Sequence, residues 1–202
     1  MIFNGIPRTG LPEKFASWNE YRRHTDMLIE TGILADTSRI WWDLRPSARY
    51  PTLETRVMDS CTSLEDSVRL AALNLCLMRK LYRLRRDNQQ WRPYPELLIG
   101  ENRWRAMRYS CDAGLLDLGR QRIVPFAQLV EELIELLRED ANELGCLPEI
   151  AGLREGKWGH RFRPAHAVST GTAGASQRTA RYDAHLEGEL PRVQALLAAA
   201  LE

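Results

Sequence analysis

Three kinds of feature are scarce in this sequence. No apolar run approaches the roughly 18 residues that a membrane-spanning helix needs. The four cysteines (Cys61, Cys76, Cys111 and Cys146) form no CxxC pair, which argues against a zinc site built from cysteine pairs. Neither sign of charge is in excess, because 28 basic residues face 27 acidic ones, so no strong overall field favours nucleic acid or a membrane. The N-terminus lacks the basic start and apolar core of a signal sequence. We therefore expect a soluble, cytoplasmic chain with reduced thiols.

The length and composition are those of an ordinary globular protein. The chain has 202 residues, of which 44% are hydrophobic and 27% are charged. This is enough for one domain with its own core, and we expect a single domain over 1–202. Strand-like and helix-like patterns both occur, which predicts an α+β fold with an antiparallel sheet covered by helices.

One stretch has a strongly β-like pattern. Two runs, 40–45 and 52–59, flank a six-residue link that holds Pro46 and Pro51. Such a link between alternating runs predicts a hairpin with an irregular loop.

Charged side chains alternate along both runs of this hairpin. Asp43 and Arg45 share one face of the first strand, and Glu54 and Arg56 share one face of the second. With Asp43 placed opposite Glu54, all four would project from the same side. Carboxylates suit Mg²⁺ and arginine forks suit phosphate oxygens, so the set fits a metal and phosphate site. The alternative is a solvated face of an antiparallel pair, which pattern alone favours.

Three segments have the pattern of amphipathic helices. The first runs from Ser17 to about Thr31, with Ser17 and Glu20 forming a capping box. The second follows Thr62, the cap that we expect, and ends in five cations within 79–86, which suit a solvated helix C-terminus. A nucleic-acid contact is the alternative for these cations.

A further helix and hairpin precede the third amphipathic segment. A helix beginning near Gly100 would place Asn102, Arg105 and Tyr109 on one stripe with Arg108 adjacent. Arginines so placed can hold a carboxylate or phosphate; the alternative is an arginine-rich exterior.

The third amphipathic segment begins at Pro125 and ends at Gly145, after a small hairpin at 115–124. We interpret its many acids as a solvated face. Residues 157–180 are small and polar, which predicts a mobile loop. This loop lacks the GxxxxGK(S/T) pattern of a P-loop.

Four motifs resemble one known family. They are WWDLRPSARYPTLETRVMD (41–59), FNGIPRTGLPEKFASWNEY (3–21), ENRWRAMRYSCDAG (101–114) and GTAGASQRTARY (171–182). Together they are similar to the bacterial carboxylate-amine ligases of the glutamate-cysteine ligase type 2 family, over about residues 1–185. The resemblance implies a fold like that of glutamine synthetase. The Gly-x-Glu-Glu-Glu strand motif of the family, which supplies metal ligands, is missing from this sequence, which resembles the C-terminal half.

The resemblance also implies a chemistry and roles for the hairpin residues. ATP would phosphorylate a carboxylate, and an amine would displace phosphate from the acyl phosphate to form an amide. Glu54 would bind Mg²⁺, Arg56 would stabilise the γ-phosphate, and Asp43 and Arg45 would orient these groups or the substrate.

Further binding residues follow from the other motifs. The resemblance implies that Asn102, Arg105 and Arg108 bind ATP or substrate, together with Gln177 and Arg178. The expected partners are a small carboxylate and an amine, with neither nucleic acid nor membrane, and either a homo-oligomer or a chain carrying the N-terminal half. The alternative is a non-catalytic paralogue or a subunit that needs such a chain.

Overall fold

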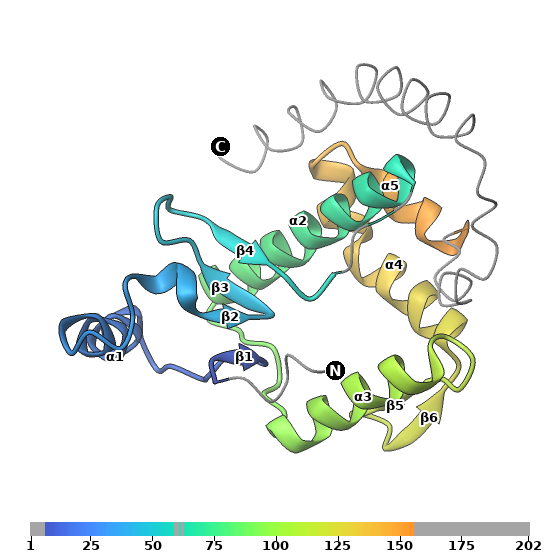
Figure 1. Ribbon diagram of the computed structural model, residues 1–202. Coiled ribbons are helices and arrows are strands. Elements are labelled where there is room, and N and C mark those ends of the chain that lie inside the picture. Colours follow the sequence, from blue (N-terminus) through green and yellow to red (C-terminus); the bar gives the residue numbers. More distant parts are fainter. Residues whose placement is uncertain (1–6, 59–60, 62, 156–202) are drawn as a thin grey trace, which may run out of the picture. The chain divides into compact units, whose positions relative to one another are not determined.

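The computed structural model describes residues 7–58, 61 and 63–155 (Figure 1). They divide between Ser60 and Cys61 into two compact units, called here the first and the second unit. Both helices and short strands occur, so the expected α+β class is confirmed. Gln177, Arg178 and the loop expected over 157–180 lie outside the described residues. The single domain expected over 1–202 stays a prediction. Within the described residues, no helix is long and apolar enough to cross a membrane.

The first unit contains one long helix, α1 (Trp18–Glu30). Its predicted N-cap is confirmed: the Ser17 hydroxyl accepts a hydrogen bond from the Glu20 N–H at 3.1 Å. The Glu20 carboxylate accepts a hydrogen bond from the Ala16 N–H at 2.6 Å, one residue before the N-cap, and not from Ser17 as in the predicted capping box. The Ser17 hydroxyl satisfies one of the unpaired donors of the first turn, which favours a helix start here.

The first unit also contains two small sheets. Strand β1 (Thr9–Gly10) pairs in parallel with β2 (Trp41–Trp42), and β3 (Leu44–Pro46) pairs antiparallel with β4 (Leu53–Thr55). A 3₁₀ helix, η2 (Thr37–Arg39), precedes β2. The predicted hairpin is therefore present, with shorter strands than the sequence suggested.

The expected register of the hairpin is wrong. Arg45, not Asp43, lies opposite Glu54. The physical reason is that Asp43 lies between two sheets: its N–H donates to the Gly10 carbonyl at 2.7 Å, and its carbonyl accepts from the Arg56 N–H at 2.6 Å. The β3–β4 ladder therefore begins only at Leu44.

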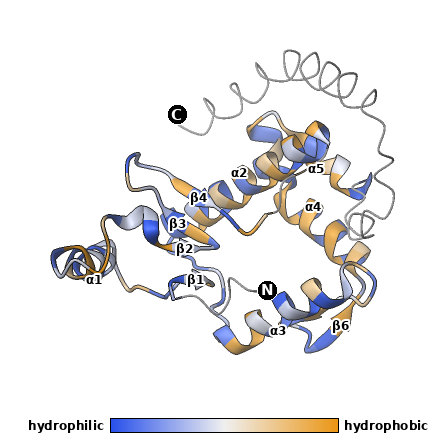
Figure 2. Cartoon of the chain, in the orientation of Figure 1, coloured by the Kyte–Doolittle hydropathy of each residue, from blue (hydrophilic) through white to orange (hydrophobic). Residues whose placement is uncertain are grey.

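The second unit is built on packed helices. They are α2 (Leu64–Arg86), α4 (Phe126–Glu143), the short α5 (Leu147–Ala151) and the 3₁₀ helix η3 (Gly152–Glu155). Figure 2 shows hydrophobic stretches along α2 and α4. The buried core cluster consists of Ala72, Cys76, Ile134, Leu137, Ala141, Leu144, Cys146, Ile150 and Leu153. Burying a side chain such as leucine contributes about 1.5–3 kcal/mol, so this cluster is the main stabilising element of the unit.

The start of α2 differs from the expectation. Ser63, not Thr62, is the N-cap, and its hydroxyl accepts from the Asp66 N–H at 3.4 Å. Serine and threonine can both cap a helix by their side-chain oxygen, so the presence of either type did not decide between the two neighbours.

Helix α3 (Glu96–Tyr109) starts earlier than the predicted Gly100, directly after Pro95. The hairpin that follows is confirmed, with β5 (Leu115–Asp117) antiparallel to β6 (Arg122–Val124). Gly114 precedes β5 with a φ of +63°, and a Cβ atom there would collide with the Val124 carbonyl. Glycine is thus required both by the backbone angle and by the close approach of β6.

Candidate functional site

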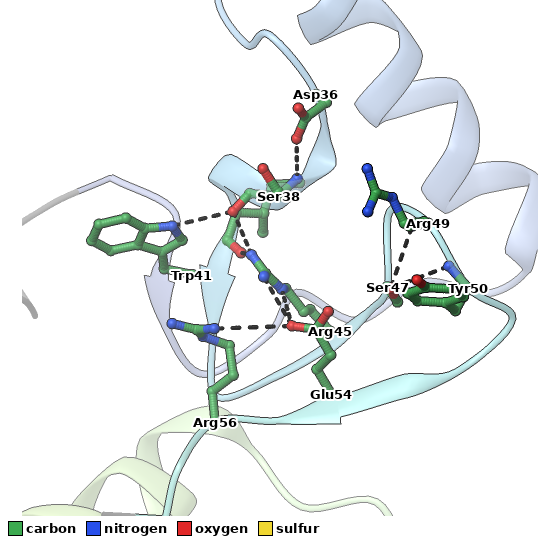
Figure 3. Close-up of polar contacts among 10 residues, drawn as sticks. Asp36, Ser38, Trp41, Arg45, Ser47, Arg49, Tyr50, Glu54 and Arg56 are labelled. Atoms are coloured by element: carbon green, nitrogen blue, oxygen red, sulfur yellow. Dashed lines mark hydrogen bonds and ion pairs between the residues drawn. The ribbon is translucent and has the colours of Figure 1, made fainter.

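The hairpin of the first unit brings three of the predicted charged residues together. Arg45 is 8% exposed, and its Nε and Nη2 atoms each lie 2.9 Å from Oε2 of Glu54. Its Nη1 atom donates at 2.5 Å to both the Ser38 and the Ile40 carbonyls (Figure 3). Arg45 therefore holds η2 and the adjoining Ile40 against β4, and it orients the carboxylate of Glu54.

Arg56 approaches the same carboxylate from the other side (Figure 3). Its Nη1 atom lies 3.9 Å from Oε2 of Glu54, and the two side chains are 42% and 37% exposed. A contact of this length between half-exposed groups is weak. The guanidinium of Arg56 is thus accessible to an anion, whereas that of Arg45 is committed to the fold.

Asp43 contacts this group of residues through its backbone carbonyl. Its carbonyl accepts hydrogen bonds from the N–H groups of Arg56 (2.6 Å) and Val57 (3.1 Å), at the point where the chain leaves β4. Asp43 therefore sets the position of the Arg56 backbone. Three of the four predicted hairpin residues therefore meet through their side chains, and Asp43 joins them through its backbone, in a register that differs from the expected one.

The residues that support this constellation were missed in the sequence. Asp36 caps η2, and its Oδ1 atom accepts from the Ser38 N–H at 2.6 Å. Hydrogen bonds from Ser38, with smaller contributions from Arg39 and Arg45, lower the pKa of the Asp36 carboxyl below its usual value. The Asp36-x-Ser38 spacing is a common turn and cap pattern, and it was the available signal.

Tyr21 lies near the same arginine. Burial raises the pKa of its hydroxyl, while a hydrogen bond with Thr37 and the charge of Arg45 act in the opposite direction.

The predicted residues of α3 contact the hairpin of the second unit. The Asn102 side chain donates to the Leu116 carbonyl and accepts from the Leu116 N–H, both at 2.7 Å. Arg105 donates to the Ala113 carbonyl at 3.1 Å and lies 5.7 Å from the centre of the Tyr109 ring. The predicted stripe is confirmed, and these contacts hold α3 against β5.

Arg108 differs from its two neighbours on α3. It is exposed, while Asn102 and Arg105 are half-buried. Of the three it has the side chain most accessible to a ligand. Their roles in binding ATP or substrate stay predictions.

A buried charge cluster in the second unit was also missed. Asp140 on α4 is 0% exposed, and its Oδ1 atom lies 3.0 Å from Nε of Arg83 and 3.5 Å from Nε of Arg79. Glu139 and Glu143 pair with the same two arginines. The interpretation of the charge runs as solvated holds for exposed residues such as Glu135, Glu139 and Arg86. It did not anticipate that Arg79 and Arg83 join the buried Asp140 in a network between α2 and α4.

Metal-ligating side chains are sparse in the part of the chain that the structure describes. Residues 7–58, 61 and 63–155 contain no group of three or more His, Cys, Asp or Glu side chains that could hold an ion. Glu54 offers one half-exposed carboxylate. It can supply a single ligand to Mg²⁺, which with nucleotide phosphates needs only one or two carboxylates.

Comparison with known proteins identifies a family whose members resemble this chain. A family model described as glutamate-cysteine ligase family 2 matches residues 1–156. A Rhodospirillum rubrum protein is 56% identical over 153 residues, which is 76% of this chain and 39% of the relative. A Paracoccus denitrificans protein is 50% identical over 183 residues, covering 89% of this chain and 48% of the relative. Both carry the curated name "Putative glutamate–cysteine ligase 2".

The similarity includes the hairpin and α3 but covers only part of each relative. A Ruegeria pomeroyi protein of the same name is 52% identical over 170 residues, which is 82% of this chain and 44% of the relative. The chain thus spans less than half the length of the relatives that it matches. The family match includes the hairpin and α3 and excludes Gln177 and Arg178. The chain belongs to glutamate-cysteine ligase family 2.

Proposed function

We propose that this chain carries part of the active site of an ATP-dependent carboxylate-amine ligase of the glutamate-cysteine ligase type. Amide formation would pass through an acyl phosphate, with a small carboxylate and an amine as substrates. The relatives are about twice as long as this chain. We therefore assign the further metal ligands to a segment like the additional one that these relatives contain. The fold of the complete site would be that of glutamine synthetase, and its location the cytoplasm.

One observation supports this proposal most directly: two arginines approach the same carboxylate oxygen of Glu54 in the matched region. ATP, when bound, supplies the phosphoryl group that activates the carboxylate. Arg45 would keep Glu54 in one orientation, so that its carboxylate can hold Mg²⁺ without moving. Fixed charges of this kind lower the barrier because they need not reorganise during the reaction.

The remaining predicted residues have distinct parts in the proposal. Arg56, which is half-exposed, would pair with phosphate oxygens and neutralise the charge that develops on them. Asp43 would position Arg56 through the backbone contact between them. Arg108 would contact ATP or substrate directly.

The other predicted binding residues complete the assignment. Asn102 and Arg105 would orient the end of α3, where their contacts with the 113–116 segment hold the helix. Gln177 and Arg178 would contribute from outside the described residues.

A second candidate is a non-catalytic paralogue, or a subunit that needs another chain. The observation behind this candidate is that the chain covers only 39–48% of the length of the three relatives above. In this case the chain would pair with itself or with a chain carrying the N-terminal half.

Calorimetric titration with Mg-ATP separates the two candidates. Under the first, Glu54 and Arg56 are enough for the chain alone to bind Mg-ATP, although more weakly than with the further metal ligands, and Glu54→Gln abolishes this binding because its one metal ligand is lost. Glu30→Gln, an exposed acid at the end of α1, is the matched control and should bind as the parent does. Unchanged affinity in Glu54→Gln would refute the metal assignment.

Two further outcomes decide whether the chain is sufficient. Release of phosphate that depends on ATP, glutamate and cysteine together would make the chain a catalyst by itself. Binding that appears only after a chain with the N-terminal segment is added would favour the second candidate.

A further inference from the structure

The first unit contains a pocket of about 370 Å³ that has no role in the proposed ligase site. Its lining combines two arginines with apolar and aromatic side chains and includes no acid. The lining residues are Pro7, Arg8, Thr9, Ile33, Leu34, Ala35, Arg39 and Trp41. The pocket therefore carries two positive charges beside an apolar wall.

The wall of this pocket is fixed by the fold. Leu34 is 3% exposed, and the indole Nε1 of Trp41 donates to the Ser38 carbonyl at 3.2 Å. The Trp41 backbone N–H donates to the Arg8 carbonyl at 2.7 Å, where β1 meets β2. Trp41 and Ile33 nevertheless stay 42% and 58% exposed, so both can contact a ligand.

Arg8 has an unusual conformation for this position. Its φ angle is +65°, in the left-handed region that residues with a Cβ atom rarely occupy. Such strain persists where the surroundings impose it, and it clusters at binding sites. The Nε atom of Arg8 is buried and has no hydrogen-bond partner among the residues that the structure describes.

Within residues 7–58, no carboxylate lies within 4 Å of the guanidinium group of Arg8 or Arg39 in an ion pair. Asp36 is close enough to Arg39 for the charge of the arginine to lower the pKa of its carboxyl. Asp36 is the nearest charged neighbour of Arg39 in sequence, and its carboxylate accepts from the Ser38 N–H. Arg8 and Arg39 both line the pocket, so an anion there would meet two positive charges.

We propose that this pocket binds a small organic anion, with its oxyanion between Arg8 and Arg39 and its apolar body against Trp41 and Ile33. The charge selects an anion, because the lining offers no carboxylate to balance a cation. The apolar wall selects one with a planar or hydrocarbon body rather than a bare ion. A carboxylate and a phosphate ester share this chemistry, and the two sources are separated below.

Ligand-observed and protein-observed NMR test the proposal without ATP or Mg²⁺, so its outcome is independent of the ligase function. Benzoate and phenyl phosphate carry the same ring with different oxyanions, and benzamide is their neutral counterpart. We expect one or both anions to shift the Trp41 indole signal saturably, and Trp41→Phe identifies that signal. Inorganic phosphate, which has no apolar body, should bind more weakly than phenyl phosphate.

Two variants separate binding from a structural role. Arg8→Gly suits the φ of +65° and removes the guanidinium, so stability should be kept or increased while affinity falls about tenfold or more. Arg39→Gln, which changes an exposed side chain, should weaken binding to a similar extent. Arg23→Gln, an exposed arginine of α1 outside the pocket, is the control and should bind as the parent does.

Three results would overturn the proposal. The first is that benzamide binds as tightly as benzoate, since charge would then have no part. The second is that Arg8→Gly and Arg39→Gln leave the affinity unchanged. The third is that neither benzoate nor phenyl phosphate shifts the Trp41 signal.

Discussion

Arg45 and Glu54 lie directly opposite each other in the β3–β4 ladder, and two nitrogen atoms of the arginine share one carboxylate oxygen at 2.9 Å. The same guanidinium also donates to the carbonyls of Ser38 and Ile40. One buried side chain thus joins the hairpin to η2 and to Ile40, the residue that follows it. The geometry separates the two arginines that approach Glu54 into a structural one, Arg45, and an accessible one, Arg56.

The first prediction concerns this structural arginine. Arg45→Lys keeps the charge but loses the planar fork, so it cannot reach Glu54 and both carbonyls together. We expect the free energy of unfolding to fall by about 2 kcal/mol, measured by urea denaturation. Arg49→Lys, in the exposed loop between β3 and β4, should change it by no more than about 0.5 kcal/mol. Equal losses in the two variants would contradict the structural role of Arg45.

The second prediction concerns the buried carboxylate between α2 and α4. Asp140→Asn leaves Arg79 and Arg83 without their shared partner, and breaking a buried ion pair costs about 3 kcal/mol. Thermal unfolding should show this loss. Glu135→Gln removes a surface acid of α4 that pairs with Arg138, and should cost less than about 1 kcal/mol.

The helices illustrate what a sequence pattern can determine. The segments predicted from Ser17 and from Pro125 correspond to α1 and α4, because apolar periodicity and local capping both act within a few residues. The start of α3 lies at Glu96, directly after Pro95, and not near the predicted Gly100. Proline suits the position before a helix, where no backbone N–H is needed.

The site illustrates what the pattern could not determine. Which residue lies opposite Glu54 depends on the pairing between strands, and the loop between them is too long to fix it. Asp140 looks like its exposed acidic neighbours along the sequence. The arginines that pair with it belong to α2, more than 50 residues earlier. Contacts between distant residues decided both cases.

The third prediction concerns the contact between α3 and β5. Asn102→Ala removes both hydrogen bonds to Leu116, so we expect a loss of about 1.5 kcal/mol in stability. A structural contact also predicts faster hydrogen exchange at the Leu116 amide, measured by NMR. Glu101→Ala, at the adjacent exposed position, should leave this exchange unchanged. If the Leu116 amide stays protected in Asn102→Ala, the contact does not hold the hairpin.

The fourth prediction concerns pH. Hydrogen bonds from Ser38 depress the pKa of Asp36 in the folded protein below its ordinary value of 3.8. A depressed pKa stabilises the fold at pH values above the unfolded pKa, and this contribution is lost as pH falls through the folded one. We therefore expect the parent to lose stability more steeply below about pH 4 than Asp36→Asn, which keeps a capping oxygen but does not titrate. Parallel slopes in unfolding experiments from pH 5.5 to 2.5 would contradict this.

The fifth prediction concerns the thiols. Cys76 and Cys146 are each 0% exposed with their sulfur atoms 3.4 Å apart, and the hydrogen bond between them, with burial, raises the pKa of Cys76. Cys61 and Cys111 are half-buried, and burial also raises the pKa of Cys111. Since the thiolate is the reactive form, iodoacetamide should modify Cys61 and Cys111 in the folded protein, with Cys111 reacting faster as pH rises.

The buried pair should react only after unfolding, which peptide mass spectrometry can follow residue by residue. The same reaction in urea is the control, because all four thiols then have similar access. If Cys76 is modified as fast as Cys111 under native conditions, the contact between α2 and the start of α5 opens readily. The rate at Cys76 thus reports directly on how firmly the core of the second unit is packed.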